Sequence, residues 1–227
     1  MYEQTGSSLR QRLVLAAGCG ACVLVAWWLL AGGGLATVGA WVGRPLSAGD
    51  PIRRLCIAAA FSIYYVRLLF TQFLFLRRGL GWSEVFSVVP WVLFIVLLVS
   101  IEGGTNPAPL RAVALCGMLL FLAGSGINSR AEYTRHVWKL RPENHGKLYT
   151  GGLFRYTRHP NYFGDLVSFS GICLLSGAWI TVVIPIIMLA GFAFVNVPAL
   201  DAHLHDHYGE AFEKYARHTP KLIPFLY

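Results

Sequence analysis

Residues 162–197, YFGDLVSFSGICLLSGAWITVVIPIIMLAGFAFVNV, form an apolar stretch of 36 residues in which Asp165 is the only charged residue. A helix that crosses a lipid bilayer needs about 20 predominantly apolar residues. The stretch is therefore too long for one such helix, and its length fits two helices joined by a tight turn. Gly177, Ala178 and Trp179 are the expected turn, with Trp179 at the membrane interface.

The composition of the whole chain indicates the same class of protein. Of its 227 residues, 56% are hydrophobic and 13% are charged, and the mean hydropathy is +0.54. Soluble domains carry about 25% charged residues, so this composition excludes a soluble globule, a disordered chain and a nucleic-acid-binding module. The apolar runs are continuous rather than alternating, which excludes a membrane β-barrel. We expect an all-α, polytopic integral membrane bundle that forms a single domain over residues 1–227.

Four further apolar runs bring the expected number of transmembrane helices to about six. We place them at residues 13–38, 52–76, 85–101 and 110–127. With this assignment, 14 of the 19 Lys and Arg residues fall on the side that carries both termini, and 4 fall on the other side. Cytoplasmic loops are enriched in Lys and Arg, so both termini are predicted to be cytoplasmic.

The segment between the fourth and fifth spans is strongly basic, with seven Lys and Arg residues within 130–158. One interpretation is a cytoplasmic loop that contacts anionic lipid headgroups. The other is an anion site, because Arg155, Arg158 and His159 directly precede Pro160, which suits the first turn of a helix. Free N–H groups at a helix start favour anions, and arginine side chains beside them can clamp a phosphate or diphosphate.

Arg67 is the remaining basic residue and lies inside the second span. An ionisable residue at this depth is energetically costly and often functional. Tyr64 precedes it by three residues and therefore shares its helix face. Two interpretations stay open: a packing role in which Arg67 pairs with Glu84, Glu102 or a helix end, and a Tyr–Arg pair at the floor of a cavity, where the phenol donates a proton to a carbonyl oxygen.

After the last span, an apolar stripe predicts one cytoplasmic amphipathic helix. The stripe consists of Leu204, Tyr208, Ala211, Phe212 and Tyr215. The acidic residues Asp201, Asp206, Glu210 and Glu213 are expected to face away from it. His203 and His207 share a face, but one such pair is a weak metal signal, and the five cysteines are an odd number that lie inside apolar runs, so no metal site is predicted.

Three motifs resemble the C-terminal half of steroid 5-alpha reductases and sterol C14 reductases, and especially short bacterial relatives of the former. They are Arg141–Lys147 (RPENHGK), Gly151–Tyr156 (GGLFRY) and Arg158–Asp165 (RHPNYFGD), followed by Tyr208-Gly209, Phe212–Tyr215 (FEKY) and the ending Leu222–Tyr227 (LIPFLY). Together they cover about 100 residues, from Asn128 to the C-terminus. The resemblance implies a membrane location, with a bacterial inner membrane expected.

The resemblance also implies an NADPH-dependent reductase of a carbon–carbon double bond, such as an enone, in a lipophilic substrate drawn from the bilayer. Residues 128–227 would form the cofactor-binding core. The cofactor-binding residues carried over are Asn128, Arg141, Lys147, Arg158, His159, Asn161, Tyr162, Asp165 and Tyr208. Tyr64 and Arg67 match a Tyr-x-x-Arg of these reductases, in which the tyrosine helps to polarise the enone carbonyl.

Two other functions stay open. Isoprenylcysteine and phospholipid methyltransferases share the Arg-His-Pro-x-Tyr core, which makes S-adenosylmethionine the alternative cofactor and a lipid or thiol the alternative substrate. These enzymes typically have Glu-Glu where this chain has Leu200-Asp201, and Gly-Pro-Tyr where it has residues 152–154, Gly-Leu-Phe. Both differences favour the reductase branch. The third function is a non-catalytic relative that binds membrane lipid or a partner.

Overall fold

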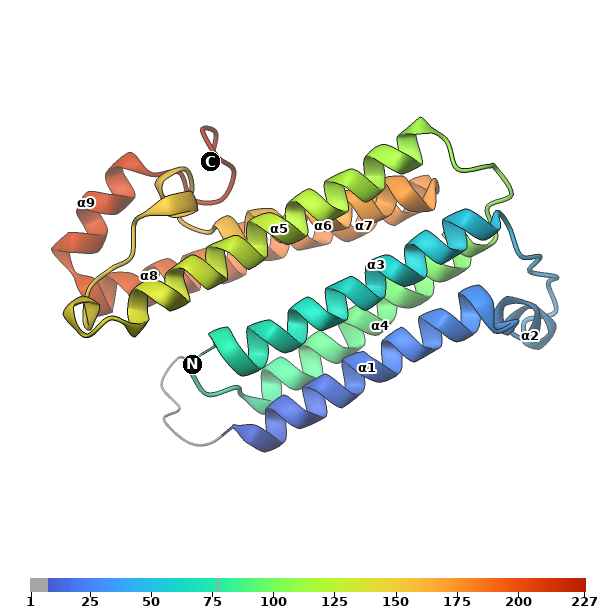
Figure 1. Cartoon of the computed structure of the whole chain (residues 1–227), viewed down its shortest axis with the longest axis horizontal. Coiled ribbons are helices and arrows are strands. Elements are labelled where there is room, and N and C mark those ends of the chain that lie inside the picture. The colour runs from blue at the N-terminus through green and yellow to red at the C-terminus, as the bar shows by residue number, and fades with distance from the viewer. Residues whose placement is uncertain (1–7, 77) are drawn as a thin grey trace. The chain divides into compact units, whose positions relative to one another are not determined.

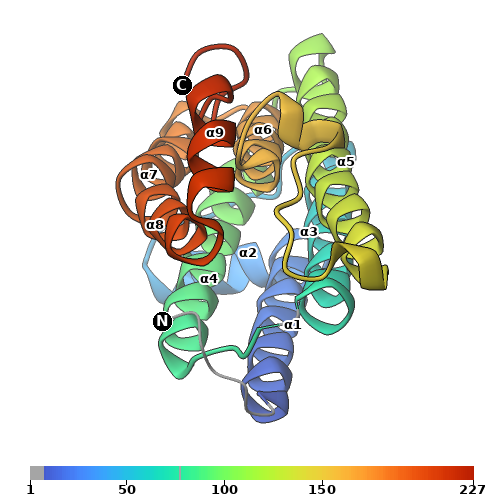
Figure 2. The same cartoon turned by 90° about the vertical axis from the view of Figure 1, so that its left-hand side faces the viewer.

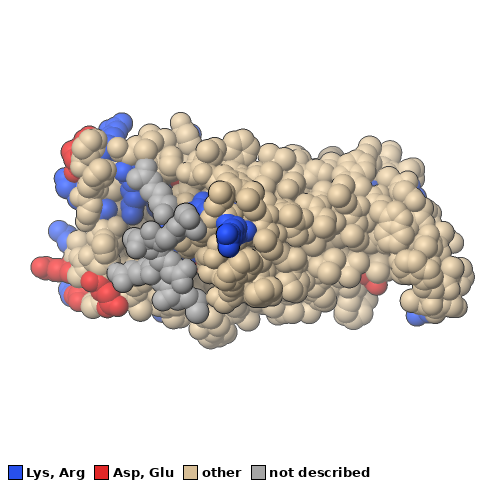
Figure 3. All heavy atoms as spheres, turned by 90° about the horizontal axis from the view of Figure 1, so that it is seen from below, with Lys and Arg blue, Asp and Glu red and all other residues tan. Residues whose placement is uncertain are grey.

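The computed structural model describes residues 8–76 and 78–227, and every regular element in these ranges is a helix. The all-α prediction is therefore confirmed. Arg77, one of the basic residues assigned to the cytoplasmic side, and residues 1–7 lie outside the described residues. Five helical segments are long and apolar enough to cross a membrane: Leu9–Ala31, Pro51–Phe75, Trp82–Gly104, Ala112–Leu140 and Trp179–Tyr208. On the face in Figure 3, charged side chains gather mainly toward the left-hand end, and much of the surface is uncharged.

The chain divides into two compact units, each described here by itself. Unit 1 contains the chain up to residue 121 together with residues 169–184, and unit 2 contains residues 122–168 and 185–227. The boundary passes through helices α5 (Ala112–Leu140), α6 (Pro160–Ser176) and α7 (Val183–Gly191). Each of the predicted functional residues therefore belongs to one unit or the other.

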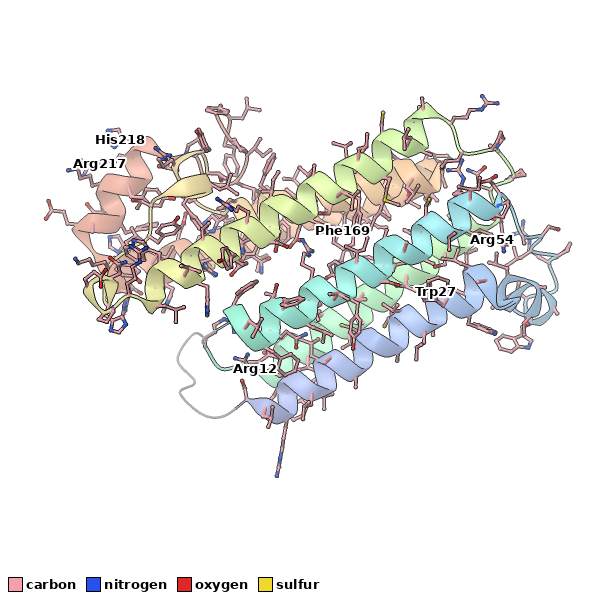
Figure 4. The ribbon with its side chains drawn as sticks, in the orientation of Figure 1. Arg12, Trp27, Arg54, Phe169, Arg217 and His218 are labelled. Carbon is pink, nitrogen blue, oxygen red and sulfur yellow. The ribbon has the colours of Figure 1, made fainter. Side chains whose placement is uncertain are left out.

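In unit 1, helices α1 (Leu9–Ala31), α3 (Pro51–Phe70) and α4 (Trp82–Gly104) pack side by side (Figure 1). Trp27 on α1 donates a hydrogen bond to the hydroxyl of Ser62 on α3 (3.0 Å; Figure 4). Arg12 on α1 donates to the carbonyl oxygens of Leu76 and Arg78 (2.9 Å each) and so holds the chain that follows α3. The α3 helix starts at Pro51, and the side chain of Asp50 caps it. It ends in a π-helical turn, η1 (Thr71–Phe75).

The first predicted span was too long at its C-terminal end. Helix α1 ends at Ala31 rather than at residue 38, and a separate short helix, α2 (Gly34–Trp41), follows it. The break falls at Gly33, which has a φ of +79°. A residue with a side chain rarely adopts this conformation, so the glycine run ends the helix although the apolar sequence continues.

The predicted extent of the fourth span was also wrong. Helix α5 continues to Leu140, so Arg130, Arg135 and Lys139 lie on a helix and the true loop begins at Arg141. Hydropathy marks only the apolar part of a helix, whereas Arg, Ala, Glu and Lys in the polar extension are good helix formers. Helix α6, with 17 residues, is shorter than the five candidate spans.

Helices α5 and α6 run antiparallel and approach each other closely at glycines. A Cβ added to Gly171 would lie 2.5 Å from the carbonyl oxygen of Gly117, and one added to Gly164 would lie 2.7 Å from that of Gly124. Each pair of glycines is seven residues apart on its helix, so one stripe of each helix meets the other. Small residues allow such backbone contact between membrane helices.

The predicted hairpin turn after α6 is confirmed. Gly177 has a φ of +69°, and the 3-10 turn η4 (Trp179–Val182) leads into α7, the π-turn η5 (Phe192–Asn196) and α8 (Val197–Tyr208). The amphipathic helix predicted for the C-terminus is present, but the predicted stripe of residues 204–215 does not lie on one continuous helix. Gly209, with a φ of +51°, ends α8, and a second helix, α9 (Glu210–His218), turns away from it (Figures 1 and 2).

Candidate functional site

A buried cluster of three charged or polar side chains forms at the start of α6. Asp201 on α8 forms an ion pair with Arg158, with 3.1 Å between Oδ2 and Nη2, and its Oδ1 lies 3.0 Å from Nε2 of His159. Arg158 is 8% exposed and His159 is 1% exposed. One carboxylate thus holds both residues that the sequence motif placed immediately before Pro160.

Asp201, which was expected to face away from the apolar stripe, thus completes the site. Arg158 is fixed further by its backbone N–H, which donates to the carbonyl oxygen of Pro220 (2.9 Å), and by the ring of Phe212, 5.6 Å from the guanidinium carbon. Its Nε is buried and has no hydrogen-bond acceptor among residues 8–76 and 78–227. The guanidinium therefore keeps one unused donor beside the helix start.

Three rings stack next to this cluster. The ring of Tyr162 lies 5.5 Å from that of His159, nearly parallel to it at 15°, and 4.6 Å from that of Phe192 at 10°. His159 and Tyr162 are three residues apart, and this spacing places them on one side of the first turn of α6. The stack holds the imidazole against Asp201 with its ring plane fixed.

Asn128 also meets the start of α6, as the resemblance implied. Its side-chain amide is buried and donates to the backbone carbonyl oxygen of Asn161 (3.0 Å). Asp165 follows one turn later on the same helix. Asn128, Arg158, His159, Asn161 and Tyr162 are thus brought together around the N-terminal turn of α6.

Arg141, Lys147 and Tyr208 form a separate part of unit 2. Arg141 and Lys147 are exposed on the loop after α5, and within the described residues no hydrogen bond or ion pair joins either side chain to Arg158. Tyr208 lies at the end of α8, and its hydroxyl accepts a hydrogen bond from Nζ of Lys139 (3.2 Å). Lys147 and Tyr208 both line a hollow of ≈ 500 Å³ between this loop, α8 and α9.

Tyr64 and Arg67 pair in unit 1, as their spacing predicts. The guanidinium carbon of Arg67 lies 5.1 Å from the centroid of the Tyr64 ring, and the ring of Phe169 meets Tyr64 edge-on at 5.2 Å. Glu84, one of the acids considered as a partner of Arg67, accepts two hydrogen bonds from the guanidinium of Arg78, at 2.6 and 2.7 Å. A phenol and a cation therefore share one face of α3.

Sequence reasoning missed Asp201 and Lys139 as members of the site. One signal for Asp201 was available: it is the first charged residue after Asp165, at the end of a long uncharged stretch. A carboxylate in that position has to find a cation or leave the apolar environment. No comparable signal marks Lys139, because it is one of several basic residues in the segment.

Comparison with known proteins gives the family. Residues 82–219, more than half of the chain, match DUF1295, a family described as a protein of unknown function. The chain belongs to the DUF1295 family. The DUF1295 match includes all nine predicted cofactor-binding residues, whereas Tyr64 and Arg67 lie before it.

Curated relatives of this DUF1295 protein include steroid reductases and methyltransferases. It is 35% identical over 115 residues to 3-oxo-5-alpha-steroid 4-dehydrogenase 1 of Mus musculus (49% of this chain, 42% of the relative). It is 40% identical over 88 residues to "Probable O-methyltransferase ustE" of Ustilaginoidea virens (38% of this chain, 31% of the relative). It is 26% identical over 115 residues to protein-S-isoprenylcysteine O-methyltransferase B of Arabidopsis thaliana (48% of this chain, 58% of the relative). The chain thus spans less than two thirds of each of these relatives. The resemblance to the steroid reductases is confirmed, and so is the likeness to the methyltransferases.

Proposed function

We propose that this protein is a membrane-embedded, NADPH-dependent reductase of an enone in a steroid- or isoprenoid-like substrate. The observation that carries the proposal is the Tyr64–Arg67 pair, with 5.1 Å between the guanidinium carbon and the ring centroid. Reduction of an enone places negative charge on the carbonyl oxygen, and a fixed donor beside a cation stabilises that charge. Transfer of a methyl group from S-adenosylmethionine needs no such donor.

The residues of unit 2 fit a phosphorylated dinucleotide. The Nε of Arg158 is buried next to the first turn of α6 and has no acceptor in the described chain. Exposed basic side chains also lie on the loop after α5. Cationic forks and helix-start amides both favour phosphate oxygens. When bound, NADPH supplies a hydride for the β-carbon of the enone. Asn128, Arg158 and Asn161 would hold it, and Asp201 would keep the Arg158 side chain in place.

In this proposal Tyr64 and Arg67 act on the substrate, and the residues around the start of α6 hold the coenzyme. Tyr64 donates a hydrogen bond to the substrate carbonyl, and Arg67 stabilises the enolate oxygen that develops as the electron pair moves from the double bond. The α-carbon then takes a proton from solvent, which balances the reduction. The apolar surface of the helices admits a substrate that is dissolved in the bilayer.

The test is titration of the purified protein in detergent with NADPH and, separately, with S-adenosylmethionine. We expect NADPH to bind and Arg158→Ala to lose that binding, while Arg217→Ala, an exposed arginine on α9, retains it. The absence of NADPH binding by the wild-type protein would remove the reductase proposal. Oxidation of NADPH in the presence of a panel of steroid and isoprenoid enones then tests the substrate class.

A methyltransferase is the second candidate, supported by the likeness to the two O-methyltransferases and by the shared Arg-His-Pro-x-Tyr core. In this case S-adenosylmethionine would occupy unit 2, and a lipid or a thiol would accept the methyl group. Binding of S-adenosylmethionine without binding of NADPH would establish it. The same two titrations therefore separate the candidates.

A further inference from the structure

An apolar groove lies in unit 2 between α5, the start of α6 and the segment that follows α9. Its volume is ≈ 310 Å³, and the residues that line it carry no charge. They include Ile127, Leu153, Tyr156, Pro160, Phe163 and Phe225. The hydroxyl of Thr157, which also lines the groove, donates to the carbonyl oxygen of Leu222 (2.9 Å) and is thus used within the protein. The groove therefore offers apolar contact, which suits a hydrocarbon chain.

Hydrogen bonds hold the C-terminal segment as one wall of the groove, beside the connection between α5 and α6 (Figure 1). The backbone N–H of Arg158 donates to the carbonyl oxygen of Pro220 (2.9 Å). Phe225 follows with a φ of +65°, a conformation that costs free energy for an aromatic residue. Its ring lies 5.9 Å from that of Tyr156, and the residue is 81% exposed. An exposed apolar wall of this kind indicates contact with a further apolar molecule.

The groove lies at the level where the apolar part of α5 ends. Ile127 lines it, and the polar residues Asn128, Ser129 and Arg130 follow on the same helix. In a membrane helix this change of composition marks the boundary between the hydrocarbon core and the headgroups. An acyl chain can therefore enter the groove while its headgroup stays among polar side chains.

Three exposed cations adjoin the lining: Arg130, Arg155 and Lys221. Arg130 lies one turn beyond the lining residue of α5, Arg155 lies between two residues that line the groove, and Lys221 belongs to the C-terminal wall. None of the three forms an ion pair with any residue that the structure describes. The nearby carboxylate of Glu132 is already paired with Arg135 (2.6 Å). The charge beside the groove is therefore positive and favours an anion.

We propose that this groove binds an anionic phospholipid, with one acyl chain in the groove and the phosphate among Arg130, Arg155 and Lys221. Arginine forks bind phosphate oxygens in pairs, and an ammonium group adds a point charge. A zwitterionic lipid brings a positive headgroup that these cations repel, so charge selects the anionic lipid. The inference is independent of the proposed reductase function, because none of the three cations is among the predicted cofactor-binding residues.

The experiment measures lipid binding to the delipidated protein in a non-ionic detergent by native mass spectrometry. The probes are dipalmitoyl phosphatidylglycerol, dipalmitoyl phosphatidylcholine and dihexanoyl phosphatidylglycerol. We expect the first to bind at least about tenfold more tightly than the other two, because only it has both the charge and the long chain. Equal binding of the two dipalmitoyl lipids would overturn the headgroup site. Equal binding of the two phosphatidylglycerols would overturn the role of the groove.

Arg130→Gln/Arg155→Gln/Lys221→Gln locates the headgroup. This variant should lose at least about tenfold in affinity for dipalmitoyl phosphatidylglycerol and keep its affinity for phosphatidylcholine. The matched control is Arg10→Gln/Lys214→Gln/Arg217→Gln, which removes the same charge from exposed positions outside the groove and should keep both affinities. An equal loss in both variants would overturn the site, since the attraction would then belong to the total charge of the protein.

Phe225→Asn tests the apolar wall. Asparagine tolerates a positive φ, so the turn should persist, as an unchanged melting temperature would show, while the affinity for dipalmitoyl phosphatidylglycerol falls at least about fivefold. An unchanged affinity would overturn the placement of the acyl chain. A dimer that Phe225→Asn dissociates, without a preference for phosphatidylglycerol, would assign the groove to a second copy of the chain instead. Displacement of the lipid by neutral steroid or isoprenoid enones would assign it to a substrate.

Discussion

Oδ2 of Asp201 lies 3.1 Å from Nη2 of Arg158, and the two residues come from α8 and the start of α6. The arginine side chain is almost fully buried, and the same carboxylate also holds His159. Removing one partner of a buried ion pair leaves an uncompensated charge, which costs more than the pair contributes. Asp201 is therefore expected to matter for stability as well as for the position of Arg158.

Asp201→Asn should lower the stability of the protein by about 3–5 kcal/mol, because the amide cannot neutralise Arg158. The measurement is thermal unfolding in detergent, followed by tryptophan fluorescence. Asp206→Asn is the matched control on the same helix, since the Asp206 side chain is 84% exposed, and its melting temperature should stay at the wild-type value. Equal melting temperatures for both variants would contradict the role of Asp201.

The glycine contacts between α5 and α6 give a second prediction. A Cβ on Gly124 would meet the backbone carbonyl oxygen of Gly164 at 2.5 Å, whereas one on Gly126 would meet nothing within 4 Å. Gly124→Ala should therefore destabilise the protein by about 1–3 kcal/mol through overpacking. Gly126→Ala should stabilise it by up to about 1 kcal/mol through helix propensity. Thermal unfolding of the two variants checks this, and a shift of the same sign in both would refute the close contact.

Much of the fold could be predicted from the sequence because lipid demands long apolar helices, and these are visible as hydropathy. The turn at Gly177 was predictable for the same reason, since 36 apolar residues have to fold back. The ends of α1 and α8 were not, because Gly33 and Gly209 interrupt patterns that otherwise continue. At Gly209, apolar residues still recur at helical spacing, and only the backbone conformation reveals the break.

The site was predictable where its residues are neighbours in sequence. The pair Tyr64–Arg67 follows from a spacing of three residues on a helix, and His159 and Tyr162 have the same spacing across the start of α6. The contact between Arg158 and Asp201 depends on how α8 packs against the start of α6, and no local pattern encodes it. The same holds for Lys139 and Tyr208.

Tyr215 should make the stability of the protein depend on alkaline pH. Its hydroxyl donates to the carbonyl oxygen of Phe154 (2.6 Å), and burial raises the pKa of its phenol. An unfolded tyrosine ionises near pH 10. Above about pH 10 the unfolded chain therefore releases a proton that the folded chain retains, and the stability that Tyr215 contributes falls as the pH rises toward the folded-state pKa.

Tyr215→Phe should cost about 1 kcal/mol at pH 8, the contribution of one hydrogen bond. The difference in melting temperature between the variant and the wild-type protein should shrink as the pH rises above 10, because the variant no longer titrates at this position. Tyr156→Phe, which changes an exposed phenol, is the control and should follow the wild-type curve. A difference that stays constant from pH 8 to pH 11 would contradict the role of burial.

Tyr64→Phe should separate catalysis from coenzyme binding. The variant keeps the ring that meets Phe169 edge-on at 5.2 Å and that lies under the guanidinium of Arg67, so folding and NADPH affinity should remain at wild-type values. It removes the proposed donor to the substrate carbonyl, and loss of one such donor lowers kcat by about 10²–10³-fold. The measurement is the rate of NADPH oxidation with an enone that the wild-type protein reduces.

Tyr65→Phe is the matched control for this experiment. The Tyr65 hydroxyl donates to the backbone carbonyl oxygen of Ala16 on α1 (3.2 Å), so its loss should lower the melting temperature by a few degrees and leave kcat within about twofold of the wild-type value. A similar fall in kcat for both variants would indicate a general effect of weakened α3 packing. An unchanged kcat for Tyr64→Phe would remove Tyr64 from the proposed mechanism, even with NADPH bound.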